Sequence, residues 1–302
     1  MIFSHPLSCL VLLAMGIQLV FFASTLTAQN NTVSLPTDRE VSETIASYRT
    51  SDSAESVEQF RKSMPAPVSD AVIRKKIIDD LPDYVPKLRV DNEALIGKVK
   101  KLIQPTLAIY GRDSVYELIL IDHDTPLVMS DSGVVLVITT GALLEVSSDD
   151  EFLGFIAHEI GHEYFGIYSI YLKHLLQKVS DRGRESALVH NLRKMLAIIE
   201  LQCDAFAAIT LAFAGYDPVV FIDALERFAA KYKEHPMAYH PPVGMRRQVA
   251  LGVVSGGGGF TRHKAHTSAL LKEIRSDIVE YRRFKILPIV MSHNVRYEKN
   301  RS

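Results

Sequence analysis

The sequence predicts an α+β domain that is mainly helical, with a small antiparallel β-sheet just before a central helix. Two short runs rich in β-branched residues, 115–121 and 134–139, are typical of strands, and 126–129 can add a third. Turn-forming residues at 130–133 precede the second run. Longer stretches on both sides repeat apolar residues every three or four positions, which is the period of an α-helix.

The amino-acid composition limits the classes of protein to which this chain can belong. The chain has 302 residues, of which 47% are hydrophobic and 23% charged, as in globular proteins. The net charge of −1 provides no general attraction to nucleic acid. The two cysteines are Cys9 and Cys203. Cys9 lies in the leader described next, so the mature chain would hold one thiol and no internal disulfide.

The N-terminus is expected to direct export. Residues 7–23 are apolar and carry no charge, and a polar stretch begins after Ala28. This pattern predicts a secretory signal cleaved after Ala28. No Lys or Arg precedes the apolar run, so an uncleaved N-terminal anchor is the alternative; either one exports the domain.

The expected organisation is a leader at 1–28, a flexible or partly helical lead-in at 29–60, the main domain at 61–255, and a C-terminal basic amphipathic helix and tail at 256–302. The last part begins with a flexible glycine joint at 256–259. Helices are predicted at 69–81, 90–110, 141–146, 186–213, 219–232, 246–254 and 267–287, besides the central helix that begins near residue 149.

The central helix carries the motif His158-Glu159-Ile160-Gly161-His162. Residues four apart lie on one face of a helix, so His158 and His162 can bind one metal ion. Glu159 lies about 100° round the helix, where it can take a proton from a water molecule at the metal. An acidic first turn and a serine cap before it favour a helix here. The alternative is a surface helix that carries two histidines and a glutamate without a shared function. This helix is too apolar for a surface position.

A catalytic zinc site needs three protein ligands. The extended motif with a third histidine is excluded, because Phe165 and Tyr168 stand where it requires Gly and His. The helix at 186–213 offers Glu200 and Asp204, four apart on one face of an apolar helix. Glu200 can be the third ligand, and Asp204 can accept the second N–H of a ligand histidine. The alternative is a pair of surface carboxylates.

Three further residues are candidates near the site. Cys203 could bind zinc as a thiolate, but it lies off the helix face shared by Glu200 and Asp204, about 100° round the helix from Asp204, which favours a buried and inert thiol. His240 precedes two prolines, and Arg246 follows six residues later. A proline-fixed loop could hold His240 over the metal, where His240 or Arg246 could stabilise an oxyanion. His240 could also close the fourth coordination position.

Taken together, the motifs HEIGH, ELQCD and HPPVGMRR resemble metallopeptidase family 48, the relatives of HtpX and of the CAAX prenyl protease, over residues 65–252. The resemblance implies a zincin-like fold of gluzincin type and one zinc ion held by His158, His162 and Glu200. It also implies Glu159 as general base, Asp204 as the partner of a ligand histidine, and catalytic or gating roles for His240 and Arg246.

The resemblance further implies what the protein acts on. No membrane span is expected after the leader, as in the exported, soluble branch of this family, so the expected function is a periplasmic zinc endopeptidase acting on misfolded envelope proteins. The partner would be a polypeptide, with no nucleic acid, and the basic helix at 267–287 leaves peripheral membrane contact open. The family's Asn-Ala-Phe before the hairpin is replaced here by residues 125–129. That departure favours an alternative, a metal-bound chaperone or binding module with latent protease activity.

Overall fold

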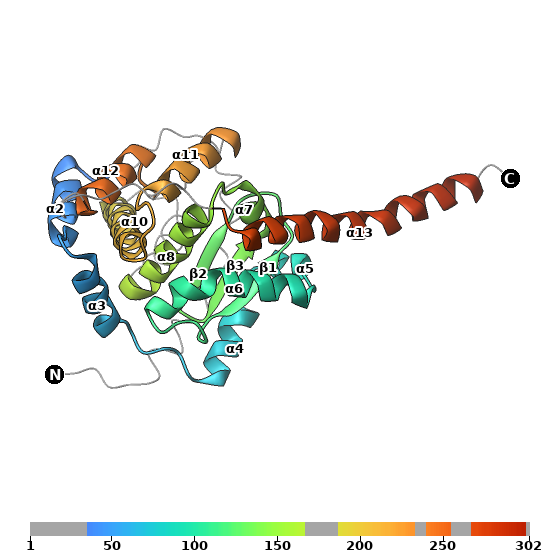
Figure 1. The fold of residues 1–302 in the computed structure, drawn as a ribbon, viewed down its shortest axis with the longest axis horizontal. Coiled ribbons are helices and arrows are strands. Elements are labelled where there is room, and N and C mark those ends of the chain that lie inside the picture. Colours follow the sequence, from blue (N-terminus) through green and yellow to red (C-terminus); the bar gives the residue numbers. More distant parts are fainter. Residues whose placement is uncertain (1–34, 167–186, 233–239, 255–266, 300–302) are drawn as a thin grey trace.

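The computed structural model describes residues 35–166, 187–232, 240–254 and 267–299 (Figure 1). The predicted leader at 1–28 and the joint at 256–259 lie outside this part of the chain. The helices are α2 (Asp38–Tyr48), α3 (Ser53–Ser63), α4 (Ala71–Asp79), α5 (Tyr84–Leu88), α6 (Glu93–Ile109), α7 (Thr140–Glu145), α8 (Asp149–Phe165), α10 (Ala187–Phe213), α11 (Val220–Tyr232), α12 (Val243–Val254) and α13 (Ala269–Lys299). The strands are β1 (Glu117–Ile121), β2 (Val128–Asp131) and β3 (Val135–Thr139). The fold is mostly helical with a small sheet before the motif helix, consistent with the predicted α+β class.

The sheet is mixed, which corrects the expectation of an antiparallel sheet. Its strand order is β1-β3-β2, with β3 parallel to β1 and antiparallel to β2. The chain leaves β1, forms β2 at the far edge and returns through the middle as β3 (Figure 1). Strand periodicity and turn residues predict a hairpin, but they do not specify which strand becomes central. The full burial of all five β3 residues agrees with the central place.

The turn between β2 and β3 lies later than the sequence indicated. Ser130 and Asp131 belong to β2, and the Val134 N–H donates to the Asp131 carbonyl at 2.9 Å. The central turn residues, Ser132 and Gly133, have φ values of 53° and 66°. Such left-handed values suit the twist of a two-residue hairpin. The later turn leaves Ser130 on a strand that packs against α8.

Helix α8 begins as its sequence predicts. Ser148 is the N-cap, and its hydroxyl accepts the Glu151 N–H at 3.2 Å. The acidic residues of the first turn lie where the helix dipole favours negative charge. The Glu151 carboxylate also accepts a bond from the side chain of Arg227 on α11, at 2.6 Å. This start fixes the register of the metal-binding motif that follows on the same helix.

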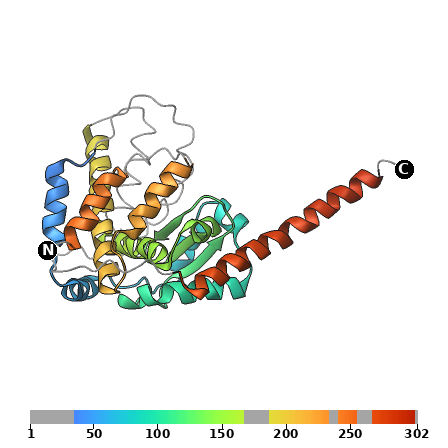
Figure 2. The same ribbon diagram turned by 45° about the horizontal axis from the view of Figure 1, so that its top comes forward.

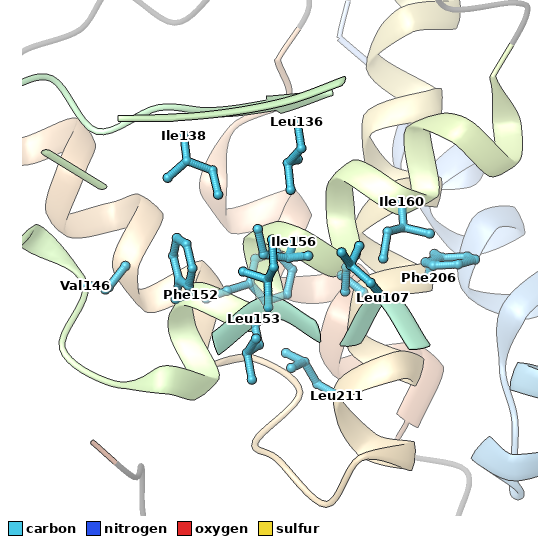
Figure 3. Close-up of a cluster of buried hydrophobic side chains, with 14 of the residues drawn as sticks. Leu107, Leu136, Ile138, Val146, Phe152, Leu153, Ile156, Ile160, Phe206 and Leu211 are labelled. Carbon is cyan, nitrogen blue, oxygen red and sulfur yellow. The ribbon is translucent and has the colours of Figure 1, made fainter. Parts of the chain in front are cut away.

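Large apolar side chains hold α8 under the sheet. Leu136 and Ile138 of β3 point toward Phe152 and Ile156 of α8 (Figure 3). All four side chains are almost completely buried. Each such burial contributes about 1.5–3 kcal/mol. Helix α8 is therefore anchored by the core, to which the motif residue Ile160 also belongs.

Helix α10 crosses α8 at the motif itself. A Cβ added to Gly161 would lie 3.2 Å from the Cα of Cys203. The two helices therefore approach each other as closely as a glycine allows. The segment Asn191–Phe213 of α10 is long and apolar enough to cross a membrane, but 72% of its most apolar window is buried in the molecule. The core helix of a folded domain passes the same test.

The lead-in, which the sequence left as flexible or partly helical, contains the two helices α2 and α3. A capping box begins α2, and Asp52 caps α3. Val41 and Val57 are buried, and both helices contact α10. These two helices therefore pack on the helix that carries Glu200.

Helix α13 begins in the core and ends outside it. Leu271, Ile274 and Ile278 are fully buried and face α6 and α7. The helix then runs away from the body of the molecule in both views (Figures 1 and 2). The sequence predicted a helix at 267–287, and the structure extends it to Lys299.

Candidate metal centre

Three elements bring one cluster of side chains together. Helix α8 supplies His158 and His162, one turn apart, and α10 supplies Glu200. The segment that leads into α12 supplies His240. The close crossing of α8 and α10 at Gly161 places Glu200 opposite the two motif histidines. The structure thus brings together four residues that the sequence proposed for one site.

The carboxylate of Glu200 is the point on which the imidazoles converge. It lies 3.3 Å from Nε2 of His158 and 3.6 Å from Nε2 of His162. His240 Nε2 is also 3.6 Å from it. These separations exceed ordinary hydrogen bonds of about 2.7–3.2 Å. The distances join two oxygens of the Glu200 carboxylate: Oε2 to His158, and Oε1 to His162 and His240. Imidazole nitrogens and carboxylate oxygens are ligands that zinc accepts, so this cluster is a candidate metal site.

Glu200 is only 3% exposed. Burial alone raises the pKa of its carboxyl, but the imidazoles of His240, His162 and His158 hold that pKa well below its usual value. A buried carboxylate that stays ionised needs positive charge beside it. The histidines supply that charge without a metal, and an ion would supply it when the histidines are neutral.

A second carboxylate lies beside the other ring nitrogen of His158. Its Nδ1 lies 3.0 Å from Oδ1 of Asp204, which is fully buried on α10. Burial alone lowers the pKa of His158, but the interactions with Asp204 and Glu200 outweigh it and raise the pKa to about 9. A carboxylate on the far nitrogen fixes the ring orientation and leaves Nε2 for a metal.

Arg246 binds the buried carboxylate of Asp204. Its Nε donates to Oδ2 of Asp204 at 2.8 Å and its Nη2 to Oδ1 at 2.7 Å. Arg246 is itself buried, and charge–charge attraction to Asp204 raises its pKa despite the cost of burial. The predicted role was to stabilise an oxyanion directly. That role stays a prediction; the contact that the structure shows is with Asp204, which in turn lies beside His158.

Cys203 is closer to the cluster than its position on the helix suggested. His158, His162 and Cys203 each offer a donor atom, and these atoms lie within 4.8 Å of one another, so this group could hold a metal ion. However, the Cys203 sulfur contacts Nδ1 of His162 at 3.5 Å, whereas Nε2 of that ring faces Glu200. The thiol and the carboxylate therefore lie at opposite nitrogens of one imidazole.

The candidate general base, Glu159, is held by the edge of the sheet. The Ser130 N–H donates to its Oε2 at 2.8 Å. The Ser130 hydroxyl lies 3.1 Å from the same oxygen. The carboxylate of Glu159 thus has a hydrogen-bond donor on β2, beside the candidate metal site.

The contacts of Ser130 and Cys203 could not be found from the sequence. Ser130 is 29 residues from Glu159, and Cys203 is 41 residues from His162. Both contacts depend on how α8 packs against β2 and α10. The only sequence signals were the hairpin residues before the motif and the glycine within it.

No protein-family model matches this chain, and no curated protein matches it either. Any functional assignment therefore depends on the geometry of the site and on the motifs.

Proposed function

We propose that this protein is an exported zinc-dependent endopeptidase of gluzincin type, with a zincin-like fold, related to metallopeptidase family 48. The observation that carries the proposal is the convergence of two motif histidines and His240 on Glu200, with Nε2-to-oxygen distances of 3.3–3.6 Å. Glu159, next to His158 on the same helix, supplies the general base that hydrolysis requires.

In this proposal the ligands are His158, His162 and Glu200. These residues would hold a zinc ion, which when bound would supply a Lewis acid to polarise the scissile carbonyl and acidify a water molecule. Glu159 takes the proton from that water and delivers it to the leaving amine. Asp204 keeps His158 in the orientation that presents Nε2. Arg246 keeps Asp204 ionised and fixed.

The substrate class and location rest on the motif resemblance and the predicted leader. We propose a misfolded or misassembled envelope protein as substrate and the periplasm as the compartment, with an uncleaved leader as the alternative tether. The experiment that tests the activity is cleavage of casein by the full chain. Chelation should abolish cleavage, and one equivalent of zinc per chain should restore it. Cleavage that survives complete metal removal would contradict the proposal.

The choice between Glu200 and Cys203 as third ligand has a spectroscopic test. We expect a cobalt-substituted protein to lack the near-ultraviolet sulfur-to-cobalt charge-transfer band, because the Cys203 sulfur faces Nδ1 of His162 and not Nε2. Cys203→Ser should keep its metal, whereas Glu200→Ala should lose it. A thiolate band that disappears in Cys203→Ser would instead make Cys203 a ligand.

His240 favours the second candidate function, a metal-bound chaperone or binding module with latent protease activity. Its Nε2 lies as far from Glu200 as that of His162 does, 3.6 Å in each case. An imidazole at this spacing can complete a tetrahedral site, and a closed site leaves no position for water.

The two candidates differ in what His240→Ala does. If His240 closes the site at rest, we expect His240→Ala to raise basal casein cleavage several-fold and to weaken zinc binding. The side chain is 29% exposed, so its removal should leave folding nearly unchanged. Unchanged cleavage together with unchanged zinc affinity would rule out a gating role.

A further inference from the structure

Strand β2 meets the motif helix at Ser130. The Ser130 N–H donates to Oε2 of Glu159 at 2.8 Å. The Ser130 hydroxyl lies 3.1 Å from the same oxygen and 3.0 Å from the carbonyl oxygen of Glu159. One serine therefore contacts both the side chain and the backbone of the candidate base.

The position of β2 explains why this N–H can reach α8. The strand order β1-β3-β2 puts β2 at an edge of the sheet, with β3 on its inner side. The N–H of Ser130 points away from β3, since its hydrogen is bonded to Glu159. Edge strands present such groups to water or to another chain. Here one of them is used by the helix that carries the metal motif.

The turn between β2 and β3 packs against α8 at Glu163, one helical turn after Glu159. Glu163 follows Glu159 by four residues and lies on the same face. Its buried carboxylate accepts bonds from Arg112 Nε at 2.9 Å and from the Tyr116 hydroxyl at 2.7 Å. A Cβ added to Gly133 would lie 2.7 Å from this carboxylate. The turn therefore packs on a buried network that prevents β2 from sliding along α8.

We propose that Ser130 is the positioning residue of Glu159 in the hydrolysis proposed above, on which this inference rests. Both side-chain contacts hold Oε2, so they also fix the direction of Oε1, which we assign to the proton of the attacking water. Ser130→Ala removes the hydroxyl and keeps the N–H, so the carboxylate loses one of its two contacts with β2 and presents Oε1 to that proton in a smaller fraction of its orientations. Such misplacement lowers kcat and leaves substrate affinity unchanged.

The first test uses metal-free protein, so that it does not depend on activity. Thermal unfolding is measured for Ser130→Ala, Glu159→Ala and the double variant. If the two residues interact, the fall in unfolding midpoint for the double variant is smaller than the sum of the single falls. Additive shifts would overturn the inference, whatever the protein cleaves.

The second test is casein cleavage by the zinc-loaded chain. We expect Ser130→Ala to lower kcat about tenfold with KM nearly unchanged, and Ser130→Thr, which keeps the hydroxyl, to restore most of it. Ser132→Ala is the matched control, because its hydroxyl on the same hairpin contacts Asp131; it should change neither constant. A loss that appears only in KM, or an unchanged kcat in Ser130→Ala, would overturn the positioning role.

The two tests separate the failure of this inference from that of the proposed function. Coupled unfolding in a protein that cleaves no substrate would remove the proposed function and the catalytic role of Ser130 with it. Additive unfolding in a protein whose cleavage depends on zinc would keep the function and remove only the role of Ser130.

Discussion

Glu159→Gln should give a protein that folds and binds zinc but does not cleave casein. The amide has the size of the carboxyl group, and its oxygen can still accept the Ser130 N–H, which lies 2.8 Å from Oε2 in the native chain. It cannot accept a proton from water. General base catalysis contributes about 10²–10⁴ in rate, so we expect the cleavage rate to fall by at least about a hundredfold.

The contrast that makes this result informative is His162→Ala. That variant removes a proposed ligand, so it should lose zinc and cleavage together, whereas Glu159→Gln should lose cleavage alone. Zinc content and casein cleavage measured on the same samples distinguish the two patterns. Wild-type cleavage rates in zinc-loaded Glu159→Gln would contradict the role of Glu159. If Glu159→Gln restored the normal phenotype of cells that lack this protein, the chaperone or binding function would be favoured.

The parts of the site that the sequence predicted are those set by helical periodicity. His158 and His162 share one face of α8, and Glu200 and Asp204 share one face of α10, because four residues make about one turn. That spacing does not predict the direction in which each face points. It depends on the apolar core under the sheet and on the close crossing at Gly161.

The parts that the sequence did not predict depend on contacts between distant elements. The mixed sheet follows from the insertion of β3 between β1 and β2, which strand patterns do not specify. The contact of Ser130 with Glu159 needs β2 at the edge beside α8. Arg246 lies 42 residues from Asp204, and a motif offers no way to distinguish an arginine that faces substrate from one that faces a buried carboxylate.

Because Arg246 faces a buried carboxylate, we expect Arg246→Met to have the largest effect on stability. Asp204 has no exposed surface, and Arg246 is the partner that binds both of its oxygens. Removing one partner of a buried ion pair typically costs about 3–5 kcal/mol, because the other charge stays buried. We expect a loss of this size in the unfolding free energy of metal-free protein, measured by urea denaturation.

Arg247→Met is the matched control, since the next residue pairs with Asp223 and Glu226, both about half exposed. Pairs of that kind contribute about 0–1 kcal/mol, so Arg247→Met should unfold almost as the wild type does. Combining Arg246→Met with Asp204→Asn should recover much of the loss, because the amide that replaces the Asp204 carboxylate leaves no charge buried without its partner. Equal losses in Arg246→Met and Arg247→Met would show that Asp204 does not need Arg246. The positioning of His158 would then have to be assigned to Asp204 alone.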